Sequence, residues 1–453
     1  MAYLPLSDAD RAEMLRATGC ERTEDLFATL PDELLDPVIE LPEPLSEQEL
    51  VGALRQLATR NRSASGYDNF LGAGVYQRFI PALVGATISR PEFYTTYTPY
   101  QAEASQGTLQ TIFEFQSMIC TLTGLDVANA SLYDGATAAV EAVMLAVAQT
   151  RRHTVAVSAG VHPETRTVLE TYCRGNDLRL DVIEMDQGLT PEEARLSEEH
   201  ACLLMAQPSF FGTVETLPAL AEAAHRVGAL AVCSVDPIAC ALITPPGEAG
   251  FDVAVGDGQQ LGIPPSFGGP HLGFMAVTSS LMRRIPGRLA GLTRDAQGDR
   301  AFALTLQTRE QHIRRERATS NVCTNHALMA LAATVYMSLM GAGGMRAIAE
   351  TSVRRAHHLA ERLQEVSGFE LAFPQAPYLW EFTLRCPRSA EALSADLREQ
   401  GILAGFPLCR VWPQLVDSLL VSCTEMTSTA AIDRYVNKVG ELANSRSREM
   451  AAV

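Results

Sequence analysis

Between residues 151 and 255 the chain alternates short apolar runs with stretches whose apolar positions repeat at helical spacing. A continuous run of β-branched and apolar residues is typical of a strand that is buried on both faces. The predicted strands are 154–158, 178–185, 201–206, 229–235 and 251–255. Because strands that alternate with helices need crossover connections, this pattern predicts a mostly parallel sheet covered by helices.

The segments between these strands carry the periodicity of helices. The predicted helices are 163–174, 190–199 and 216–228. The second would begin with Thr190 as its N-cap and Pro191 in the first helical position. Glu193, three residues after Thr190, would complete a capping box.

Beyond residue 324 the order of elements changes. Two long helices are joined there by a glycine-rich hinge, GAGG, at 341–344. The elements predicted after them are strand 379–386, helix 389–401, strand 419–423 and helix 429–443. This order indicates a smaller α+β domain that follows the large one.

The first 64 residues are amphipathic and helical in pattern, but the proline-rich stretch at 37–47 interrupts them. These residues are too apolar for a free tail, and their helical pattern is too interrupted for a domain. We therefore expect an N-terminal arm. The predicted division is an N-terminal arm at 1–64, a large domain at 65–335 and a small C-terminal domain at 336–453.

The composition, with 47% hydrophobic and 20% charged residues among 453, is that expected of an ordinary soluble protein. A formal charge of −17 argues against nucleic acid and anionic membrane surfaces as partners. Apolar stretches reach only about ten residues, against the roughly 20 that a membrane span needs. The N-terminus turns acidic before a signal core could form, so a cytoplasmic protein is expected. The ten cysteines include no C-x-x-C pair and no zinc spacing, and they are interpreted as free thiols without a metal site.

Lysine is almost absent from the chain. Of the 36 basic residues only Lys438 is a lysine, and it falls in the closing helix near Asp433 and Glu441, where a solvated helix face is expected. Since a Schiff base requires a primary amine, the core of this protein cannot hold a carbonyl cofactor covalently.

Ligands of open parallel sheets bind beyond the carboxyl ends of the strands, which directs attention to the residues that follow each strand. Asp236 follows 229–235 and could pair with a protonated ring nitrogen, or it could serve as a turn residue before Pro237. His162 could stack on a planar cofactor or close a turn before Pro163. Both alternatives remain open for each residue.

The segment DGAT, which begins at Asp134, stands at the start of a predicted helix. A helix N-terminus is a ready anion site, as a phosphate would require. The carboxylate of Asp134 would instead cap the free amides and repel a phosphate. The Gly- and Pro-dense loop at 256–276 allows close approach of the backbone but specifies no ligand.

Two polar segments lack any regular period. The first, 97–107, is dense in Tyr, Gln and Ser, and it lines either a site or an interface or is an ordered structural loop. The second, 308–325, carries Arg309, Arg314, Arg315 and Arg317, which form a solvated salt-bridged face or recognise an anion at an interface. The sequence has no Ser-His-Asp arrangement, P-loop or dinucleotide fingerprint.

Taken together, five segments resemble the P-protein of the glycine cleavage system, and more closely the first subunit of its two-chain bacterial form, a glycine dehydrogenase (decarboxylating). The resemblance extends over essentially the whole length, with the segments in the family's order. The segments are 70–84, 97–107, 122–142, 262–276 and 307–325.

This resemblance implies a fold-type-I, aminotransferase-like α/β architecture. In the cofactor-bearing chain of that family a His-Lys pair precedes a similar Gly-rich loop, and its lysine binds pyridoxal phosphate. Counting back eleven places from Pro270 lands on Gln259, and an amide cannot form a Schiff base. The resemblance therefore implies a half that is not catalytic alone, with no catalytic, cofactor-binding or metal residues of its own.

The same resemblance implies the reaction and the partners. The assembled enzyme would decarboxylate glycine, release carbon dioxide and transfer the aminomethyl group to the lipoyl arm of the H-protein. Pyridoxal phosphate would be bound by the second subunit, in an assembly with two copies of each chain. Residues of this chain expected nearest the shared site are Tyr97, Tyr100, Gln101, Ser105, Gln106, Arg314, Arg315, Thr319 and Ser320.

Two other functions compete with this one. An independent pyridoxal-phosphate enzyme, such as an aminotransferase or lyase, requires a lysine at a strand end, which this sequence does not offer. A non-enzymatic scaffold that retains an old enzyme fold would leave the partner active by itself.

Overall fold

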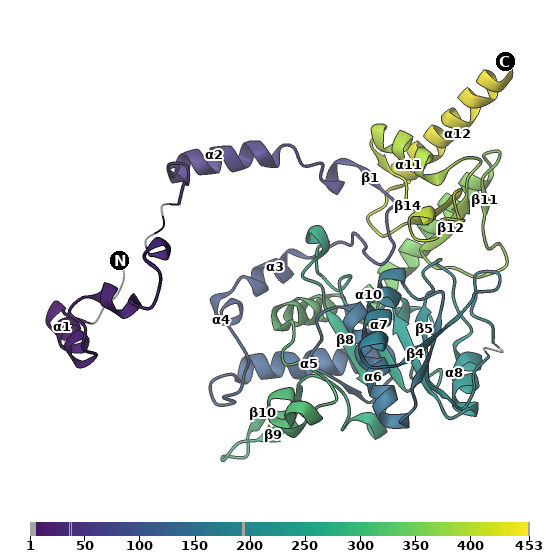
Figure 1. The fold of residues 1–453 in the computed structure, drawn as a ribbon. Coiled ribbons are helices and arrows are strands. Elements are labelled where there is room, and N and C mark those ends of the chain that lie inside the picture. The colour runs from purple at the N-terminus through teal and green to yellow at the C-terminus, as the bar shows by residue number, and fades with distance from the viewer. Residues whose placement is uncertain (1–5, 36, 38, 193–194, 452–453) are drawn as a thin grey trace. The chain divides into compact units, whose positions relative to one another are not determined.

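The structure of the protein is a computed structural model that describes residues 6–35, 37, 39–192 and 195–451 (Figure 1). The chain divides into two compact units, Met1–Arg62 and Ser63–Val453. In the first unit, α1 spans Asp8–Ala17 and α2 spans Glu47–Ala58, and a serine capping box begins each helix. None of the described residues of this unit is buried, although many of them are apolar.

A seven-stranded sheet forms the centre of the second unit. Its strand order is β2-β8-β7-β6-β5-β3-β4. The five strands from β7 to β4 run parallel, whereas β8 is antiparallel to β7 and β2 is antiparallel to β8. The predicted mostly parallel sheet is therefore confirmed. The strands are β2 Val127–Ala128, β3 Thr154–Ser158, β4 Arg179–Ile183, β5 His200–Gln207, β6 Leu230–Val235, β7 Val253–Asp257 and β8 Gly273–Val277.

Helices cover both faces of this sheet, because successive side chains of a strand point to opposite faces. In β3, Val155 and Val157 pack with α6 (Gly135–Thr150) and α7 (Pro163–Gly175), which cover one face. Ala156 joins the core on the other face. That face is covered by α5 Gln106–Thr123, α8 Leu217–Arg226 and α10 Ala327–Gln364. Strands β3, β5 and β7 are thereby removed from water on both faces, which explains their apolar runs, whereas the edge strand β4 stays partly exposed.

The helix predicted at 190–199 is wrong for the described residues of that segment, while Glu193 lies outside them. The hydroxyl of Thr190 donates to Glu215 Oε1 over 2.7 Å, and its amide donates to Glu215 Oε2 over 2.9 Å. The side chain that was expected to cap a helix is therefore engaged with a buried carboxyl group from another part of the chain. The local capping pattern predicts a helix here, but the tertiary contact with Glu215 determines the conformation of Thr190.

The long helix α10 is interrupted at Gly341, whose φ of 57° and ψ of −178° are not helical, and this confirms the predicted hinge. Its apolar stretch meets the length and composition of a membrane-spanning helix. Ala330, Ala333 and Tyr336 are nevertheless buried in the core. Since α10 packs against α5 and against α3 (Ala82–Ile88), we interpret it as a core helix.

A second, smaller sheet is built by the C-terminal part of the chain. It is antiparallel, with the order β11-β12-β15-β14, and β1 pairs with β13 beside it. Lys438 donates to Glu441 Oε2 over 2.7 Å on the exposed side of α12, as expected. The elements are β1 Asp68–Asn69, β11 Glu370–Leu371, β12 Glu381–Arg385, α11 Ala390–Glu399, β13 Ile402–Leu403, β14 Phe406–Pro407, β15 Ser418–Ser422 and α12 Thr429–Ala451.

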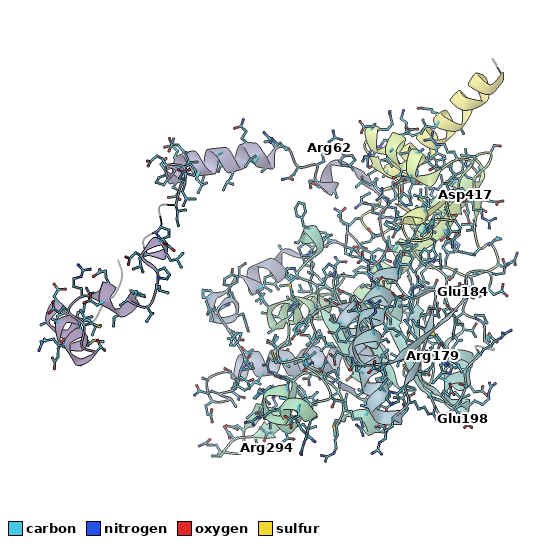
Figure 2. All side chains as sticks on the ribbon, in the orientation of Figure 1. Arg62, Arg179, Glu184, Glu198, Arg294 and Asp417 are labelled. Atoms are coloured by element: carbon cyan, nitrogen blue, oxygen red, sulfur yellow. The ribbon has the colours of Figure 1, made fainter. Side chains whose placement is uncertain are left out.

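A hairpin of β9 (Leu289–Arg294) and β10 (Arg300–Thr305) forms a separate two-stranded sheet and packs against α5. Arg294 marks its outer end in Figure 2. The short helices α4 (Pro91–Tyr94) and α9 (Gln311–Arg314) lie in the segments that precede α5 and follow the hairpin. Arg179, labelled in Figure 2, lies on β4, an edge strand of the large sheet. It pairs with Asp181 and Glu199, and such charges at an edge discourage strand addition.

Candidate functional site

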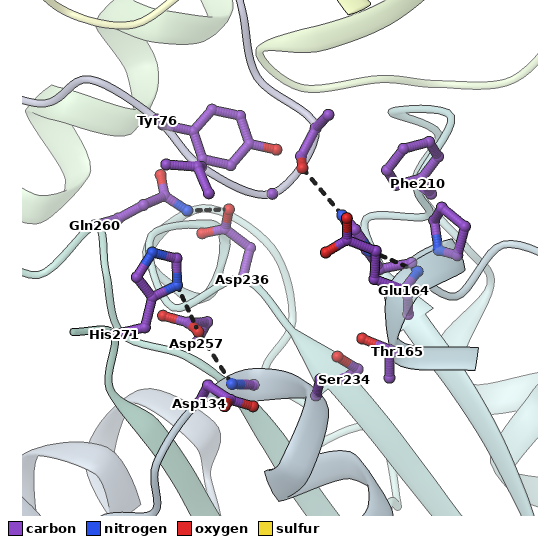
Figure 3. Close-up of a pocket in the computed structure, with 18 of the residues that line it drawn as sticks. Tyr76, Asp134, Glu164, Thr165, Phe210, Ser234, Asp236, Asp257, Gln260 and His271 are labelled. Carbon is purple, nitrogen blue, oxygen red and sulfur yellow. Dashed lines mark hydrogen bonds and ion pairs between the residues drawn. The ribbon is translucent and has the colours of Figure 1, made fainter. Parts of the chain in front are cut away.

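A cavity of about 750 Å³ opens at the carboxyl ends of the parallel strands (Figure 3). His162 follows β3, Asp236 follows β6 and Asp257 ends β7, and all three line this cavity. Residues of the small sheet, among them Glu381, close its other side. As the sequence predicts, side chains at the carboxyl ends of the parallel strands lie together around one cavity.

Two carboxylates accept hydrogen bonds from two of the first three amides of α6, and the N-terminus of this helix lines the cavity. Asp134 Oδ1 accepts a hydrogen bond from the backbone amide of Thr137 over 2.8 Å, so the predicted cap is confirmed. Asp257 Oδ2 accepts from the amide of Gly135 over 3.0 Å. His271 Nδ1 lies 3.2 Å from the same Asp257 oxygen, and this hydrogen bond raises the pKa of His271. The positive end of the helix is thus occupied by protein charge.

Asp236 serves as a turn residue and also faces the cavity. Its Oδ1 accepts hydrogen bonds from the amides of Ile238 at 2.8 Å and Ala239 at 3.3 Å. Its Oδ2 accepts from Gln260 Nε2. Burial raises the pKa of Asp236, although Arg78 and these hydrogen bonds act in the opposite direction. Both carboxylate oxygens are therefore engaged within the chain.

His162 also closes a turn, at the start of α7. Its Nδ1 accepts a hydrogen bond from the amide of Glu164 over 3.2 Å, and its Nε2 lies 3.1 Å from the carbonyl oxygen of Ala73. The ring stands edge-on to Phe210, with 4.8 Å between centroids. Burial lowers the pKa of His162, which favours the neutral imidazole. Its nitrogens are engaged by backbone groups on both sides.

A buried Tyr76–Glu381 pair forms a further part of the cavity wall. Tyr76 Oη donates to Glu381 Oε2 over 2.7 Å, and the amide of Ala73 donates to Oε1 over 2.7 Å. Burial raises the pKa of Glu381 to about 7. Sequence reasoning missed this pair, although a glutamate inside the apolar strand 379–386 was a signal that could have found it.

The two adjacent glutamines after β7 have different roles. Gln259 is buried; its Oε1 accepts from the amide of Tyr76, and its Nε2 donates to the carbonyls of Tyr76 and Ile263. These distances are 3.0, 3.0 and 2.7 Å. Gln260, the next residue, is the amide that lines the cavity beside Asp236. Gln259, the residue counted back from the Gly-rich loop, therefore bonds to backbone groups and does not line the cavity.

Pyridoxal phosphate, the cofactor that the resemblance implies, does not fit the residues of this cavity. Carboxylates of Asp134 and Asp257 stand at the helix N-terminus where a phosphate would bind. The cavity has no lysine, since Lys438 lies on α12. Among the described residues, no group of three or more His, Cys, Asp or Glu could hold a metal ion, and none of the ten cysteines forms a disulfide.

The residues expected in the first polar segment lie outside the cavity. Tyr97 and Tyr100 are 82% and 50% exposed, and Gln101 is exposed as well. Ser105 is the N-cap residue of α5 and makes no side-chain capping bond. Gln106 bonds within the chain: its Nε2 donates to Ala102 O and Phe302 O, and its Oε1 accepts from Phe302 N. The two tyrosines therefore expose part of their aromatic surface, whereas Gln106 ties this segment to the β9–β10 hairpin.

The second polar segment divides in a similar way. Arg314, Arg315 and Thr319 are exposed, while Ser320 is partly buried and its Oγ accepts from the amide of Val322 over 3.0 Å. Arg309 turns inward and donates to the carbonyls of Ile285 and Gly287. The exposed members face solvent, and Arg309 ties the segment to the stretch between β8 and β9.

Comparison with known proteins gives consistent results over the whole chain. A family model described as Glycine cleavage system P-protein matches residues 1–439. A probable glycine dehydrogenase (decarboxylating) subunit 1 of Thermomicrobium roseum is 47% identical over 451 residues, which are 97% of this chain and 99% of that protein. The protein of the same name from Geobacillus kaustophilus is 46% identical over 443 residues, with 97% and 98% covered.

Solved structures agree with these matches. An inhibitor-bound crystal structure of glycine decarboxylase (P-protein) of the glycine cleavage system superimposes with a TM-score of 0.89 and 44% identity, over 97% of this chain and all of that one. A sphingosine-1-phosphate lyase of Burkholderia pseudomallei, 14% identical, gives a TM-score of 0.64 over 92% of this chain and 96% of that one. The latter likeness concerns the fold alone, and it bears out the predicted fold-type-I architecture.

Proposed function

Because this chain belongs to the glycine cleavage system P-protein family and shares its role in glycine cleavage, we propose that it is the non-catalytic half of a two-chain enzyme. The designation subunit 1 of its relatives implies a partner subunit. In the proposed complex, two copies of each chain assemble in the cytoplasm. Glycine is decarboxylated there, and the aminomethyl group passes to the lipoyl arm of the H-protein.

One observation carries the assignment of the cofactor to the partner subunit. Asp134 and Asp257 occupy the N-terminus of α6, which is the natural seat for a phosphate in such a sheet. A phosphate brought there would meet two carboxylates at short range in a partly buried setting, where charges are poorly screened. Pyridoxal phosphate on the partner subunit would supply the electron sink for the electrons left when carbon dioxide departs.

The absence of an amine supports the same assignment. Gln259 stands where the family's Schiff-base lysine is expected, and its three hydrogen bonds hold it away from the cavity. An amide has no nucleophilic lone pair on nitrogen with which to form an imine. In this proposal the position has changed from a catalytic to a structural role.

The contribution of this chain is to complete the wall of the partner's site. The exposed residues of the two polar segments are Tyr97, Tyr100, Arg314, Arg315 and Thr319. Aromatic and arginine side chains are common at the centres of protein interfaces. When they are covered by the partner subunit, they would exclude water from the reacting glycine, which strengthens every electrostatic contact there.

The N-terminal unit contributes to assembly in the same proposal. In α2, the side chains of Leu50, Leu54 and Leu57 lie on one helical face, and each is about half exposed. Apolar faces of this kind indicate a surface that a partner covers. We propose that the arm is buried against the second subunit.

Glycine-dependent exchange of labelled carbon dioxide, with lipoylated H-protein present, tests this function. We expect neither purified chain alone to support exchange and the mixture of both to do so. If the partner subunit alone reached the full rate, this chain would be a scaffold. If this chain reached it alone with added pyridoxal phosphate, it would be an independent enzyme.

A further inference from the structure

Arg288 connects the two polar segments that the proposed function places against the partner subunit. It lies just before β9, and its side chain is only 5% exposed. Its main-chain carbonyl accepts from the amide of Ala130 over 2.8 Å, and Ala130 in turn accepts from Asn325 Nδ2 over 2.8 Å. The backbone of Arg288 is thereby fixed to the residues that follow β2.

The guanidinium group of Arg288 reaches both segments. Its Nη2 donates to Tyr100 Oη over 3.3 Å and to the carbonyl oxygen of Cys323. Its Nη1 lies 3.3 Å from Asn325 Oδ1 and 3.5 Å from Thr324 Oγ1. The Cζ atom lies 5.4 Å from the centroid of the Tyr100 ring, which adds a cation–π contact. One rigid fork thus joins Tyr100 to the stretch 323–325.

Glu310 supplies the counter-charge without holding the guanidinium group directly. Its side chain is 6% exposed, and its Oε2 lies 4.0 Å from Arg288 Nε. Neither atom has a hydrogen-bond partner among the described residues. His312 Nδ1 lies 3.6 Å from the same oxygen, and its ring stands edge-on to Tyr100, with 6.2 Å between centroids. The carboxylate lowers the cost of burying the cation while the fork stays free to bind the loops.

We propose that Arg288 is a positioning residue, which holds Tyr100 and residues 323–325 in the geometry in which they meet the partner's site. This inference rests on the proposed function. Tyr100 is half exposed and belongs to a segment without regular structure, and its ring contacts the Arg288 guanidinium group and the edge of the His312 ring. A lysine could not replace Arg288, because one ammonium group cannot present the same planar set of donors to acceptors on both segments.

The test compares R288K with wild type in the reconstituted two-chain enzyme. We expect kcat for glycine-dependent exchange to fall by about 100-fold, because a displacement of about 1 Å in a positioning group can cost that much. The KM for glycine and the affinity of the two chains should stay within about twofold, since the substrate and most of the interface are untouched. An unchanged kcat would overturn the inference.

R152K is the matched control. Arg152 Nη1 also donates to backbone carbonyls, those of His200 and Val227, each over 2.9 Å, but at the amino ends of the strands. We expect kcat to remain within about twofold of wild type in this variant, because it contacts neither polar segment. An equal loss of kcat in R152K and R288K would show a general effect of removing a guanidinium group and would overturn the inference.

A double variant separates positioning from general stability. If Arg288 acts through Tyr100, R288K should lower kcat much less in a Y100A background than in wild type, because the group it positions is already gone. Full additivity would contradict the proposal.

If R288K does not fold, N325A provides a second test, because it removes one acceptor of the Arg288 guanidinium group. We expect N325A to lower kcat by about tenfold. An unchanged kcat in N325A would also contradict the proposal.

Failure of this inference differs from failure of the proposed function. If the partner subunit were active without this chain, wild type and R288K would both be dispensable, and the proposed function would fall. If wild-type chain is required but R288K replaces it fully, the proposed function stands and only the role of Arg288 is lost.

Discussion

The backbone amide of Gly135 donates a 3.0 Å hydrogen bond to Asp257 Oδ2, a carboxylate 122 residues further along the chain. This contact joins the first turn of α6 to the last residue of β7. Asp134 bonds to Thr137 beside it, so two carboxylates of the protein occupy the N-terminus of α6, where an anion would otherwise bind. These two carboxylates are the observation that supports binding of the cofactor by the partner subunit.

Removal of both carboxylates should allow an anion to bind at the N-terminus of α6. In D134S/D257N the serine can still cap α6, while two negative charges near the helix N-terminus are gone. At about 0.3–1 kcal/mol for each charge, inorganic phosphate should bind about tenfold more tightly than to wild type. Equilibrium dialysis with labelled phosphate measures this. Equal phosphate binding by the variant and wild type would show that the two carboxylates do not prevent anion binding at the N-terminus of α6.

Gln259 should act as a structural residue in unfolding experiments. In Q259L the amide and carbonyl of Tyr76 and the carbonyl of Ile263 lose their partners in a buried place. We expect the free energy of unfolding to fall by about 3 kcal/mol, since each stranded group costs about 1–3 kcal/mol. Urea denaturation measures the loss. Q297L, a change in the exposed turn of the β9–β10 hairpin, should leave stability within about 0.5 kcal/mol.

Stability should decline between mildly acidic and neutral pH because of Glu381. Burial raises its pKa from an ordinary value near 4.5 to about 7. In that window the unfolded chain releases this proton while the folded chain keeps it, so the free energy of unfolding falls as pH rises, by at most about 3 kcal/mol. Below pH 4.5 the full stability is present, and above pH 7 the loss is complete.

Replacement of the acid by its amide tests this assignment. Compared with wild type, E381Q should show a flatter dependence of unfolding free energy on pH between 4.5 and 7, measured by urea denaturation at each pH. E350Q, a change at an exposed position of α10, should keep the wild-type slope. Identical slopes in wild type and E381Q would mean that Glu381 titrates in the folded chain as it does in water.

The exposed tyrosines should matter for turnover and not for the fold. We expect Y97A and Y100A to lower exchange by the reconstituted pair roughly tenfold, which corresponds to about 1.4 kcal/mol of barrier, without dissociating it. Turnover and analytical ultracentrifugation of the mixture give the two readouts. Y172A, on the surface of α7 and 39% exposed, is the matched control. Unchanged turnover in Y97A and Y100A would remove both from the proposed wall.

Much of the fold could be predicted because burial on both faces leaves a strong sequence signal. The strand 154–158 coincides with β3, and the cap at Asp134 follows from a short acidic side chain before a helix. The expected helix at 190–199 could not be excluded locally, since Thr190 bonds to Glu215, which lies 25 residues away.

The site itself was harder to predict, because it depends on side-chain direction and on long-range contacts. Counting back from the Gly-rich loop predicts Gln259, but the fold is needed to distinguish its amide, which bonds to backbone groups, from that of Gln260, which lines the cavity. Arg288 belongs to no motif, and its contact with Tyr100 spans 188 residues. Contacts of that separation leave no periodic pattern in a single sequence.

The position of the cofactor in the assembled enzyme tests the central claim most directly. The two chains are mixed with pyridoxal phosphate, reduced with borohydride and digested, and the peptides are analysed by mass spectrometry. We expect the reduced pyridoxyl group on a lysine of the partner subunit. A pyridoxyl group on Lys438 or on any other residue of this chain, at an amount matching the activity, would contradict the account.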